Sequence, residues 1–356
     1  MASALVFTGG GTAGHVLPVE PLIRRFSDLG WEAHFIGSKS GLETRLLSDM
    51  PVICHEITCG KLRRYFSFEN FVDALRVPVG VIEAWTVLRH VRPRLVFSKG
   101  GYVSFPVVVA AWLLRIPVIV HESDRSAGLA NRMAFPFARL VCTNFEGSAI
   151  KARARVEWTG MPLRRALFEG DAEAGRRLIE APAGKPVVVV VGGSLGSAML
   201  NKAVREVPLE LTQRAHIVHV CGPGQIDHAF DNVAGYTQFE YLGETWGDVL
   251  AAADLVVSRA GATMLGELMA LRIPSVLVPL GRAASRGEQI ENARYAEAQG
   301  AARVLLEESL SGEALASEVS EMLENLHEWK SQLQGNPSID AAERIERLIL
   351  ELSSGE

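Results

Sequence analysis

The residues best suited to chemistry in this 356-residue chain lie in two glycine-rich turns, one in each half. Gly9-Gly10-Gly11-Thr12-Ala13-Gly14-His15 follows the apolar run 4–7, and Gly192-Gly193-Ser194-Leu195-Gly196-Ser197 follows the valine run 187–191. An apolar run that breaks into glycines and then into a helical pattern predicts a buried strand, a tight turn and a helix start. The N–H groups of such a turn can approach an anion, and the helix dipole favours negative charge there. Two such turns predict two nucleotide-type domains that face one cleft.

His15 is the candidate general base of the first half. It closes the first turn, and an imidazole with a pKa near neutrality is the usual proton acceptor in catalysis. A purely structural histidine is the alternative. Glu122 and Asp124, which follow a predicted strand, could orient an acceptor or share the role of base.

The second half offers groups for a nucleotide sugar. The backbone N–H groups of Ala262 and Thr263 could hold a diphosphate, and Glu267 could accept hydrogen bonds from a ribose diol. A close-packed helix start with a solvated glutamate is the alternative. Gln289 and Asn292 carry neutral amides, which suit sugar hydroxyls, although polar residues on an exposed helix would look the same.

Several other chemistries are disfavoured. Gly9, Gly11 and Gly14 satisfy G-x-G-x-x-G, but the strand at 32–37 ends without the acid that an NAD ribose requires. Neither turn leads into the Gly-Lys-Ser/Thr of an ATP-binding loop. The four cysteines form no CxxC pair, and His216 and His219 should point to opposite faces of a strand. We therefore expect no metal and no cofactor.

The elements that must position these residues alternate along the whole chain, which predicts two parallel α/β domains. The strands are expected near 4–8, 32–37, 52–57, 94–98, 117–121, 139–143, 186–191, 216–221, 237–242, 254–258, 274–279 and 302–305. A hinge near 159–162 divides a domain at 1–162 from one at 163–337. A capped helix at 338–356, with Ile345, Leu348, Ile349 and Leu352 in an apolar stripe, should pack back on the first domain.

Composition narrows the class of protein. Hydrophobic residues make up 48% of the chain and charged residues 22%, as in ordinary globular proteins. A formal net charge of −5 disfavours nucleic acid as a partner. No signal peptide and no apolar stretch that could span a bilayer is apparent, and reduced thiols fit the cytoplasm.

Taken in order, the motifs resemble one family. They are Gly10 to His15, Gly100-Gly101-Tyr102-Val103-Ser104, His121-Glu122, Gly128-Leu129-Ala130-Asn131, Gly192-Gly193-Ser194, Arg259-Ala260-Gly261-Ala262 with Glu267, and Gln289 with Asn292-Ala293. The ordered set resembles the MurG family of bacterial N-acetylglucosaminyltransferases, in glycosyltransferase family 28, over nearly the whole chain. The resemblance implies a GT-B fold, with two Rossmann-like parallel-sheet domains and a deep cleft between them.

The resemblance also implies the reaction and its residues. N-acetylglucosamine would move from UDP-N-acetylglucosamine to the C4 hydroxyl of an undecaprenyl-diphosphate-linked muramoyl peptide (lipid I), with inversion, to give lipid II for the cell wall. The implied donor site comprises Arg164, Ser194, Leu242, Ala262, Thr263, Met264, Leu265, Glu267, Gln289 and Asn292. The implied acceptor side comprises Thr12, Ala13, Gly14, His15, Asp124 and Asn131.

Three residues depart from the family pattern. Ala13 stands where a second glycine pair is usual, and Met161 and Asp124 each stand where asparagine is usual. Asp124 would bring a negative charge into the cleft. These departures concern the acceptor more than the donor.

A basic and apolar segment suggests a membrane surface as a partner. Lys61, Arg63, Arg64 and Arg76 are interleaved with Tyr65, Phe66, Phe68, Phe71 and the run 77–81. Such a pattern suits anionic lipid, whereas two core helices with solvated charges are the alternative. With a polyprenyl-linked acceptor, the chain would lie peripherally on the cytoplasmic face of the cell membrane, where proteins of cell-wall synthesis would be further partners.

Three alternatives remain open at this point. A UDP-N-acetylglucosamine 2-epimerase shares the implied fold but is an isomerase. A catalytically silent scaffold could bind a UDP-sugar without turning it over. A paralogous glycosyltransferase could act on another lipid or on an antibiotic.

Overall fold

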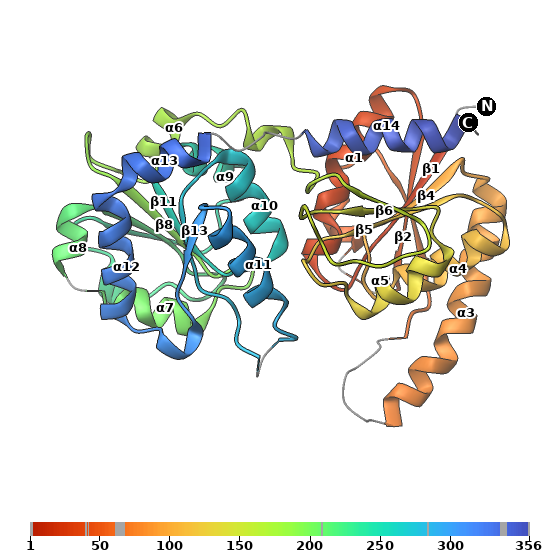
Figure 1. Ribbon diagram of the computed structural model, residues 1–356, viewed down its shortest axis with the longest axis horizontal. Helices are drawn as coiled ribbons and strands as arrows, with labels where there is room; N and C mark the ends of the chain where they lie inside the picture. The colour runs from red at the N-terminus through yellow and green to blue at the C-terminus, as the bar shows by residue number, and fades with distance from the viewer. Residues whose placement is uncertain are drawn as a thin grey trace. The chain divides into compact units, whose positions relative to one another are not determined.

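The computed structural model describes residues 3–39, 41, 43–60, 68–207, 209–282, 285–334 and 340–354 (Figure 1). The chain divides into two compact units. The first unit comprises Met1–Leu163 with Ile339–Glu356, and the second comprises Arg164–Ser338. Each unit is built on one parallel sheet with helices on both faces, which confirms the predicted fold class.

The first unit has a seven-stranded sheet in the order β3-β2-β1-β4-β5-β6-β7. Its strands are β1 (Ala4–Thr8), β2 (Glu32–Ser38), β3 (Ile53–Ile57), β4 (Leu95–Ser98), β5 (Val118–Glu122), β6 (Leu140–Thr143) and β7 (Arg155–Trp158). The first six are predicted from the sequence, but β7 is not. No residue of this edge strand is buried, and Arg155 and Glu157 interrupt the kind of apolar run that marks β1, β4, β5 and β6.

Alternate residues of the central strands supply two cores. Leu5 and Phe7 of β1 face one side of the sheet, where they pack with α1 (Glu20–Asp28) and α14 (Ala341–Ser354). Val6 faces the other side, which α3 (Phe68–Val91) and α4 (Ser104–Leu113) cover. Two-sided burial explains why these strands read as continuous apolar runs.

Helix α14 completes the core of the first unit from the far end of the chain. Its first turn is capped by Asp340, whose Oδ1 accepts a hydrogen bond from the Glu343 N–H at 2.9 Å. Ile345 and Ile349 are fully buried in the same cluster as Leu5. Residues 338 and 339 of the predicted capped start lie outside the described residues.

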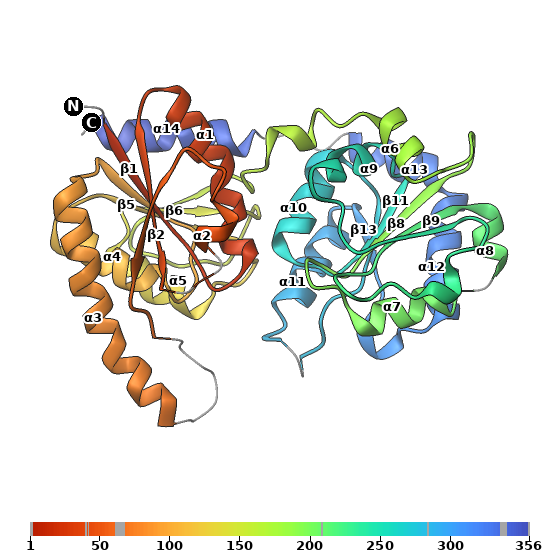
Figure 2. The ribbon, with the colours of Figure 1, turned by 180° about the vertical axis from the view of Figure 1, so that it is seen from behind.

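Helix α3 is one continuous helix and, in Figures 1 and 2, extends beyond the sheet of its own unit. Of the predicted membrane-facing segment, residues 61–67 lie outside the described residues, as do the side chains of 68–75. Arg76 and Val79 are exposed, as is Ile82 on the following turn. No helix within the described ranges is long and apolar enough to cross a bilayer.

The second unit has a six-stranded sheet in the order β10-β9-β8-β11-β12-β13 (Figure 2). Its strands are β8 (Val187–Val191), β9 (His216–Val220), β10 (Tyr236–Phe239), β11 (Leu255–Ser258), β12 (Ser275–Leu277) and β13 (Ala302–Val304). All six are predicted from the sequence, although β10 and β12 end earlier than expected. Helices α7 (Ala198–Arg205), α10 (Ala262–Leu271) and α11 (Glu288–Ala298) each begin shortly after the carboxyl end of a strand.

Candidate functional site

The first glycine turn follows β1 and rests on a buried carboxylate. Glu43, which is 1% exposed, begins α2 (Glu43–Leu46) and accepts a hydrogen bond from the Gly11 N–H at 3.2 Å. Gly11 has a φ of +89°, which favours glycine, and a Cβ on Gly10 would lie 2.2 Å from Glu43 Oε1, so any larger residue there would displace the carboxylate. Because Glu43 already occupies the Gly11 amide, the prediction that this turn presents its N–H groups to an anion does not hold for Gly11. The sequence alone predicts no role for Glu43.

A second pair of glycines packs against the first turn. Gly101, after β4, has a φ of +84°, and a Cβ there would lie 2.1 Å from the Gly10 carbonyl oxygen. This backbone contact joins the ends of β1 and β4. It therefore brings His15 next to Lys99.

His15 is oriented by the backbone of β4. It ends the short helix η1 (Ala13–His15), is half-buried, and places Nδ1 3.2 Å from the Lys99 carbonyl oxygen. A carbonyl oxygen can only accept, so this contact requires a hydrogen on Nδ1. The neutral ring then keeps its lone pair on Nε2, which suits a proton acceptor. Thr12 is exposed beside it, and Gly14 is half-buried.

Glu122, at the end of β5, is 2% exposed and accepts three hydrogen bonds. The donors are the Asp124 N–H at 3.0 Å, the Gly128 N–H at 3.0 Å and Asn131 Nδ2 at 2.8 Å. Asn131, itself 4% exposed, also donates to the His121 carbonyl oxygen. Both carboxylate oxygens of Glu122 are therefore engaged, and the geometry suits holding the loop 123–131 better than moving a proton.

A buried lysine, for which the sequence alone predicts no role, lies under the same loop. Lys99 is fully buried and donates from Nζ to Ser123 Oγ and, at 3.1 Å, to His121 Nδ1. His121 Nε2 lies 2.9 Å from the Gly160 carbonyl oxygen, in the segment that leaves the first unit. Burial lowers the pKa of Lys99 to about 8, against the opposing charges of Glu122 and Asp124. Burial, and then the charge of Lys99, lower the pKa of His121 well below its ordinary value.

In the second unit, α10 presents an open N-terminus. Its N-cap, Gly261, has no side chain that could accept a hydrogen bond. The N–H groups of Ala262, Thr263 and Met264 belong to the first turn, where N–H groups have no acceptor within the helix. Leu265 is different. Its N–H donates to the Gly261 carbonyl oxygen at 2.9 Å and its side chain is 1% exposed, so neither group is available for direct contact with a ligand.

Glu267 lies one turn into α10 and is 8% exposed. Burial raises its pKa, against a hydrogen bond from Trp246 Nε1 at 3.0 Å and the charge of Arg164. The predicted uracil contact, Leu242, uses its carbonyl oxygen to accept both the N–H and the hydroxyl of Thr245. A backbone contact from Leu242 to a base would therefore use its N–H.

The remaining donor residues differ in exposure. Ser194 is exposed beside Gly193, whose φ of +96° opens the second turn. Gln289 is half-buried and accepts from the Leu280 N–H at 3.1 Å, which leaves its amide nitrogen for a ligand. Asn292 is 0% exposed and donates to the Ala260 carbonyl oxygen at 3.2 Å. Because it is buried, Asn292 supports the loop before α10 rather than meeting a sugar directly.

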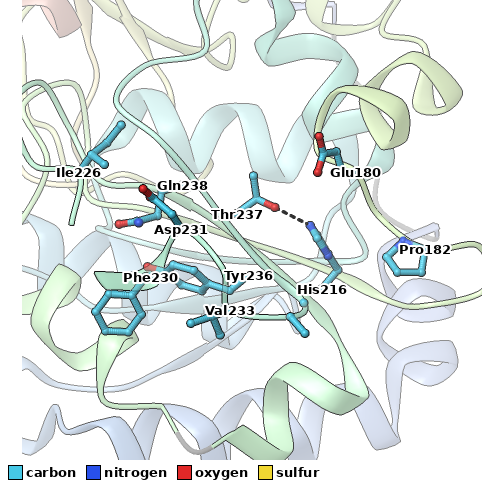
Figure 3. Close-up of a pocket in the computed structure, with 12 residues that line it drawn as sticks. Glu180, Pro182, His216, Ile226, Phe230, Asp231, Val233, Tyr236, Thr237 and Gln238 are labelled. Carbon is cyan, nitrogen blue, oxygen red and sulfur yellow. Dashed lines mark hydrogen bonds between the residues drawn. The ribbon is translucent and has the colours of Figure 1, made fainter. Parts of the chain in front are cut away.

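A hollow of about 410 Å³ lies elsewhere in the second unit (Figure 3). Its lining includes His216 and Thr237, whose side chains lie 3.1 Å apart, together with Phe230 and Tyr236. His216 and Tyr236 begin β9 and β10, so this hollow lies at the amino ends of the strands. It contains none of the predicted site residues. Within the described part of the chain, no three His, Cys, Asp or Glu side chains form a group that could hold a metal ion.

Comparison with known proteins gives matches along both halves of the chain. Residues 5–143 match the glycosyltransferase family 28 N-terminal domain, and residues 187–345 match the family 28 C-terminal domain. A protein of Legionella pneumophila (strain Paris) is 41% identical over 353 residues, which cover 99% of this chain and 97% of that protein. A protein of Lachnoclostridium phytofermentans is 43% identical over 349 residues, with 98% of each chain covered. Both are named UDP-N-acetylglucosamine–N-acetylmuramyl-(pentapeptide) pyrophosphoryl-undecaprenol N-acetylglucosamine transferase.

Solved structures support the fold. The crystal structure of Acinetobacter baumannii MurG matches with a TM-score of 0.77 and 24% identity, and covers 98% of this chain and 99% of that one. The glycosyltransferase of kitacinnamycin matches with a TM-score of 0.71 and 16% identity, covering 97% and 99% respectively. At these identities the structural likeness establishes the architecture alone.

Proposed function

This chain belongs to glycosyltransferase family 28, and from that premise we propose that it transfers N-acetylglucosamine from UDP-N-acetylglucosamine to an undecaprenyl-diphosphate-linked N-acetylmuramoyl peptide. The product would be lipid II, the lipid-linked precursor of peptidoglycan. One observation carries the proposal: the chain is 41% to 43% identical, over nearly its full length, to proteins named for this transfer.

The second unit supplies the proposed donor site. Ser194 and the first-turn amides of Ala262, Thr263 and Met264 would bind the diphosphate, because a helix N-terminus favours negative charge. Glu267 would accept hydrogen bonds from the ribose, with Leu242 near the uracil. Gln289 would offer its amide nitrogen to the sugar hydroxyls, and Arg164 would lie near the donor through its proximity to Glu267.

The first unit supplies the proposed base. His15 Nε2 takes the proton of the acceptor C4 hydroxyl as that oxygen attacks the anomeric carbon. The new carbon–oxygen bond forms as the bond to the β-phosphate breaks, and UDP leaves with the electron pair. Attack from the face opposite UDP inverts the anomeric configuration. The N-terminal amides of α10 stabilise the negative charge that develops on UDP.

Glu122 and Asn131 act as positioning residues in this mechanism, since both are buried and bonded to the loop 123–131. Asp124 stands where the family usually has asparagine. The ammonium of Lys99 lies close enough to Asp124 for their charges to interact. The positive charge of Lys99 therefore offsets part of the negative charge that Asp124 adds.

The acceptor carries a polyprenyl tail, so we place the protein peripherally on the cytoplasmic face of the membrane. Arg76, Val79 and Ile82 of α3 support this placement, with Val79 46% and Ile82 66% exposed. Sedimentation with vesicles tests it. Anionic phosphatidylglycerol vesicles should retain the protein more than phosphatidylcholine vesicles, and the double variant Val79→Ser, Ile82→Ser should weaken retention; equal retention of the wild type by both lipids would contradict the placement.

A transfer assay tests the function itself. UDP release and lipid-linked disaccharide are measured with UDP-N-acetylglucosamine, with and without a short-chain lipid I analogue. Release that requires the analogue and yields the disaccharide lipid is the expected result. His15→Ala should lower kcat by about 10²- to 10⁴-fold while calorimetry shows donor binding intact. His228→Ala, which removes a histidine whose side chain is 86% exposed, should leave kcat unchanged.

Other outcomes would redirect the assignment. Donor binding without transfer to the analogue would reject this acceptor and call for trials of other lipid or antibiotic acceptors. Conversion of UDP-N-acetylglucosamine to its 2-epimer without lipid would make the protein an isomerase. Full activity of His15→Ala would remove His15 from the role of base.

A further inference from the structure

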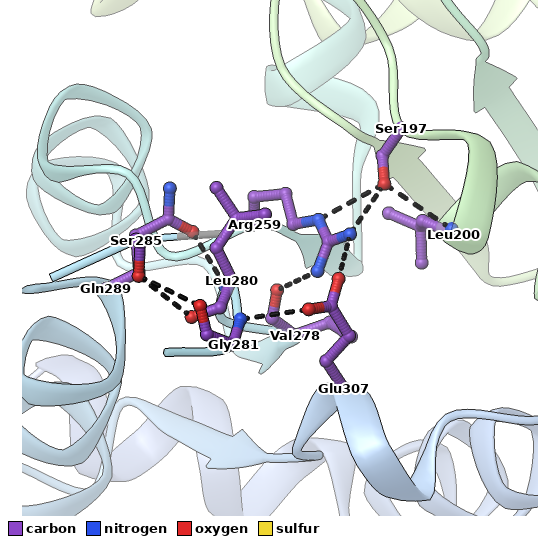
Figure 4. Close-up of polar contacts among 9 residues, drawn as sticks. All are labelled: Ser197, Leu200, Arg259, Val278, Leu280, Gly281, Ser285, Gln289 and Glu307. Atoms are coloured by element: carbon purple, nitrogen blue, oxygen red, sulfur yellow. Dashed lines mark hydrogen bonds and ion pairs between the residues drawn. The ribbon is translucent and has the colours of Figure 1, made fainter. Parts of the chain in front are cut away.

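Loops from four neighbouring strands of the second sheet meet at one ion pair that is largely buried (Figure 4). Arg259 follows β11, and Glu307 begins the short helix η7 (Glu307–Ser309) after β13. Their side chains are 9% and 14% exposed, and Arg259 Nη2 lies 2.6 Å from Glu307 Oε1. The pair lies at the carboxyl edge of the sheet, where parallel sheets bind ligands.

Arg259 fixes the loop that follows β8. Its Nη2 and Nε donate to Ser197 Oγ at 2.7 and 3.2 Å, and its Nη1 donates to the Val278 carbonyl oxygen at 3.2 Å. Ser197 caps α7 and ends the turn that contains Ser194. The guanidinium therefore ties the proposed diphosphate turn to the end of β12.

Glu307 fixes the loop that follows β12. Its second oxygen, Oε2, accepts the Gly281 N–H at 2.9 Å. Gly281 in turn accepts the Ser285 N–H at 3.1 Å, and the preceding Leu280 N–H holds the side chain of Gln289. Burial disfavours the charged form of Glu307, but the hydrogen bonds from Gly281 and Arg259 outweigh it and lower the pKa of the carboxyl group.

We propose that Glu307 is a positioning residue that sets the sugar-reading Gln289 against the diphosphate turn at Ser194. This inference rests on the proposed function, because that function gives those two residues their ligands. Glu307 acts through Arg259 and Gly281: without it, Arg259 is left buried without its carboxylate and the Gly281 amide loses its acceptor. Misplacement of a binding group by about 1 Å can cost on the order of 100-fold in rate.

Two ligands separate this role from a general loss of structure. Calorimetry gives the affinity for UDP-N-acetylglucosamine and for UDP, which lacks the sugar that Gln289 would read. Glu307→Ala should weaken UDP-N-acetylglucosamine about tenfold and UDP less than threefold, and should lower kcat with the lipid I analogue by about 10- to 100-fold. Glu307→Gln should fall between this variant and the wild type, because its amide oxygen can still accept the Gly281 N–H.

A second variant perturbs the contact between Glu307 and the Gly281 N–H by changing Gly281. Gly281→Ala keeps Glu307 but places a methyl 3.0 Å from its Oε2, so it should reproduce the selective loss of UDP-N-acetylglucosamine affinity. Glu324→Gln is the matched control, since Glu324 pairs with Arg214 at the surface, with side chains 60% and 50% exposed. It should change neither affinity.

The outcomes of the two proposals are distinguishable. Equal weakening of UDP and UDP-N-acetylglucosamine in the Glu307 variants, or no change in either, would overturn the positioning role. A wild type that binds UDP-N-acetylglucosamine but does not glycosylate the lipid analogue would overturn only the proposed acceptor. A wild type that binds neither ligand would overturn both proposals.

Discussion

The buried ammonium of Lys99 makes the stability of the first unit depend on pH. Burial lowers the pKa of Lys99 from 10.5 to about 8, with Glu122 and Asp124 offsetting part of the effect. Below pH 8 the Lys99 ammonium is charged in both states, but it is hydrated only in the unfolded chain. The buried charge therefore lowers the free energy of unfolding. Between about pH 8 and pH 10.5 the folded form loses the proton while the unfolded form keeps it. Stability from this source therefore rises as the pH rises through that window.

The substitution Lys99→Met removes this titration and keeps a side chain of similar length. The pKa difference, at about 1.4 kcal/mol per pH unit, corresponds to about 3 kcal/mol. At pH 7 the variant escapes this cost but leaves His121 and Ser123 without their donor, which costs about 1–3 kcal/mol. These two effects oppose each other at pH 7. The informative quantity is therefore the change in the stability difference with pH.

Denaturant unfolding at pH 7 and at pH 10, followed by tryptophan fluorescence, measures this change. The wild type should gain about 2–3 kcal/mol relative to Lys99→Met between the two pH values. Other titrating groups are common to both proteins and cancel in the difference. Lys202→Met, which replaces a side chain that is 77% exposed, is the control and should show no such change. A stability difference between the wild type and Lys99→Met that is equal at pH 7 and pH 10 would show that the pKa of Lys99 is not lowered in the folded chain.

Three further substitutions test other parts of the structure. Trp246→Phe removes the N–H that donates to Glu267, so the already raised pKa of Glu267 should rise further. The loss of UDP affinity on acidification should then begin at a higher pH. Calorimetry from pH 5 to pH 8 measures this, and the same dependence of affinity on pH in both proteins would contradict it. Gly101→Ala adds a backbone clash to a positive φ and should cost roughly 2–4 kcal/mol in denaturant unfolding, more than Gly30→Ala, which has a φ of +76° but open space around its Cβ. Ile345→Ala should cost about 2–4 kcal/mol, and a fully stable variant would mean that α14 contributes little to the first core.

The fold was predictable because parallel strands are buried on both faces. The run Val187 to Val191 is fully buried, and its uninterrupted apolar pattern marks a strand without any knowledge of its neighbours. Strand β7 follows a different rule. As an edge strand it leaves Arg155 exposed, and a mixed polar sequence of four residues carries no such pattern.

The parts of the candidate site that would bind a ligand through backbone N–H groups could be predicted from the sequence. The glycine turns and the start of α10 come directly after strands in the sequence. Their position at the carboxyl edge of a parallel sheet could therefore be predicted from the order of the elements along the chain. The roles of Glu43, Lys99 and Glu307 could not be predicted, because in the sequence a buried or largely buried charged residue cannot be told from a solvated one until its partner is known. Those partners lie far along the chain: Gly11 is 32 residues from Glu43, Ser123 is 24 from Lys99, and Arg259 is 48 from Glu307.

The position of α14 affects the order in which the chain can fold during its synthesis. The helix follows the whole of the second unit in sequence, yet Ile345 and Ile349 fill the core formed by Leu5 and Phe26. During synthesis, the residues of the second unit are therefore translated before the helix that completes the core of the first unit. Before α14 packs, the first unit exposes an apolar face, and exposed apolar surface promotes non-specific association. A chain that lacks α14 would therefore leave the core around Leu5 and Phe26 without the side chains of Ile345 and Ile349, although the whole of the second unit precedes that helix in sequence.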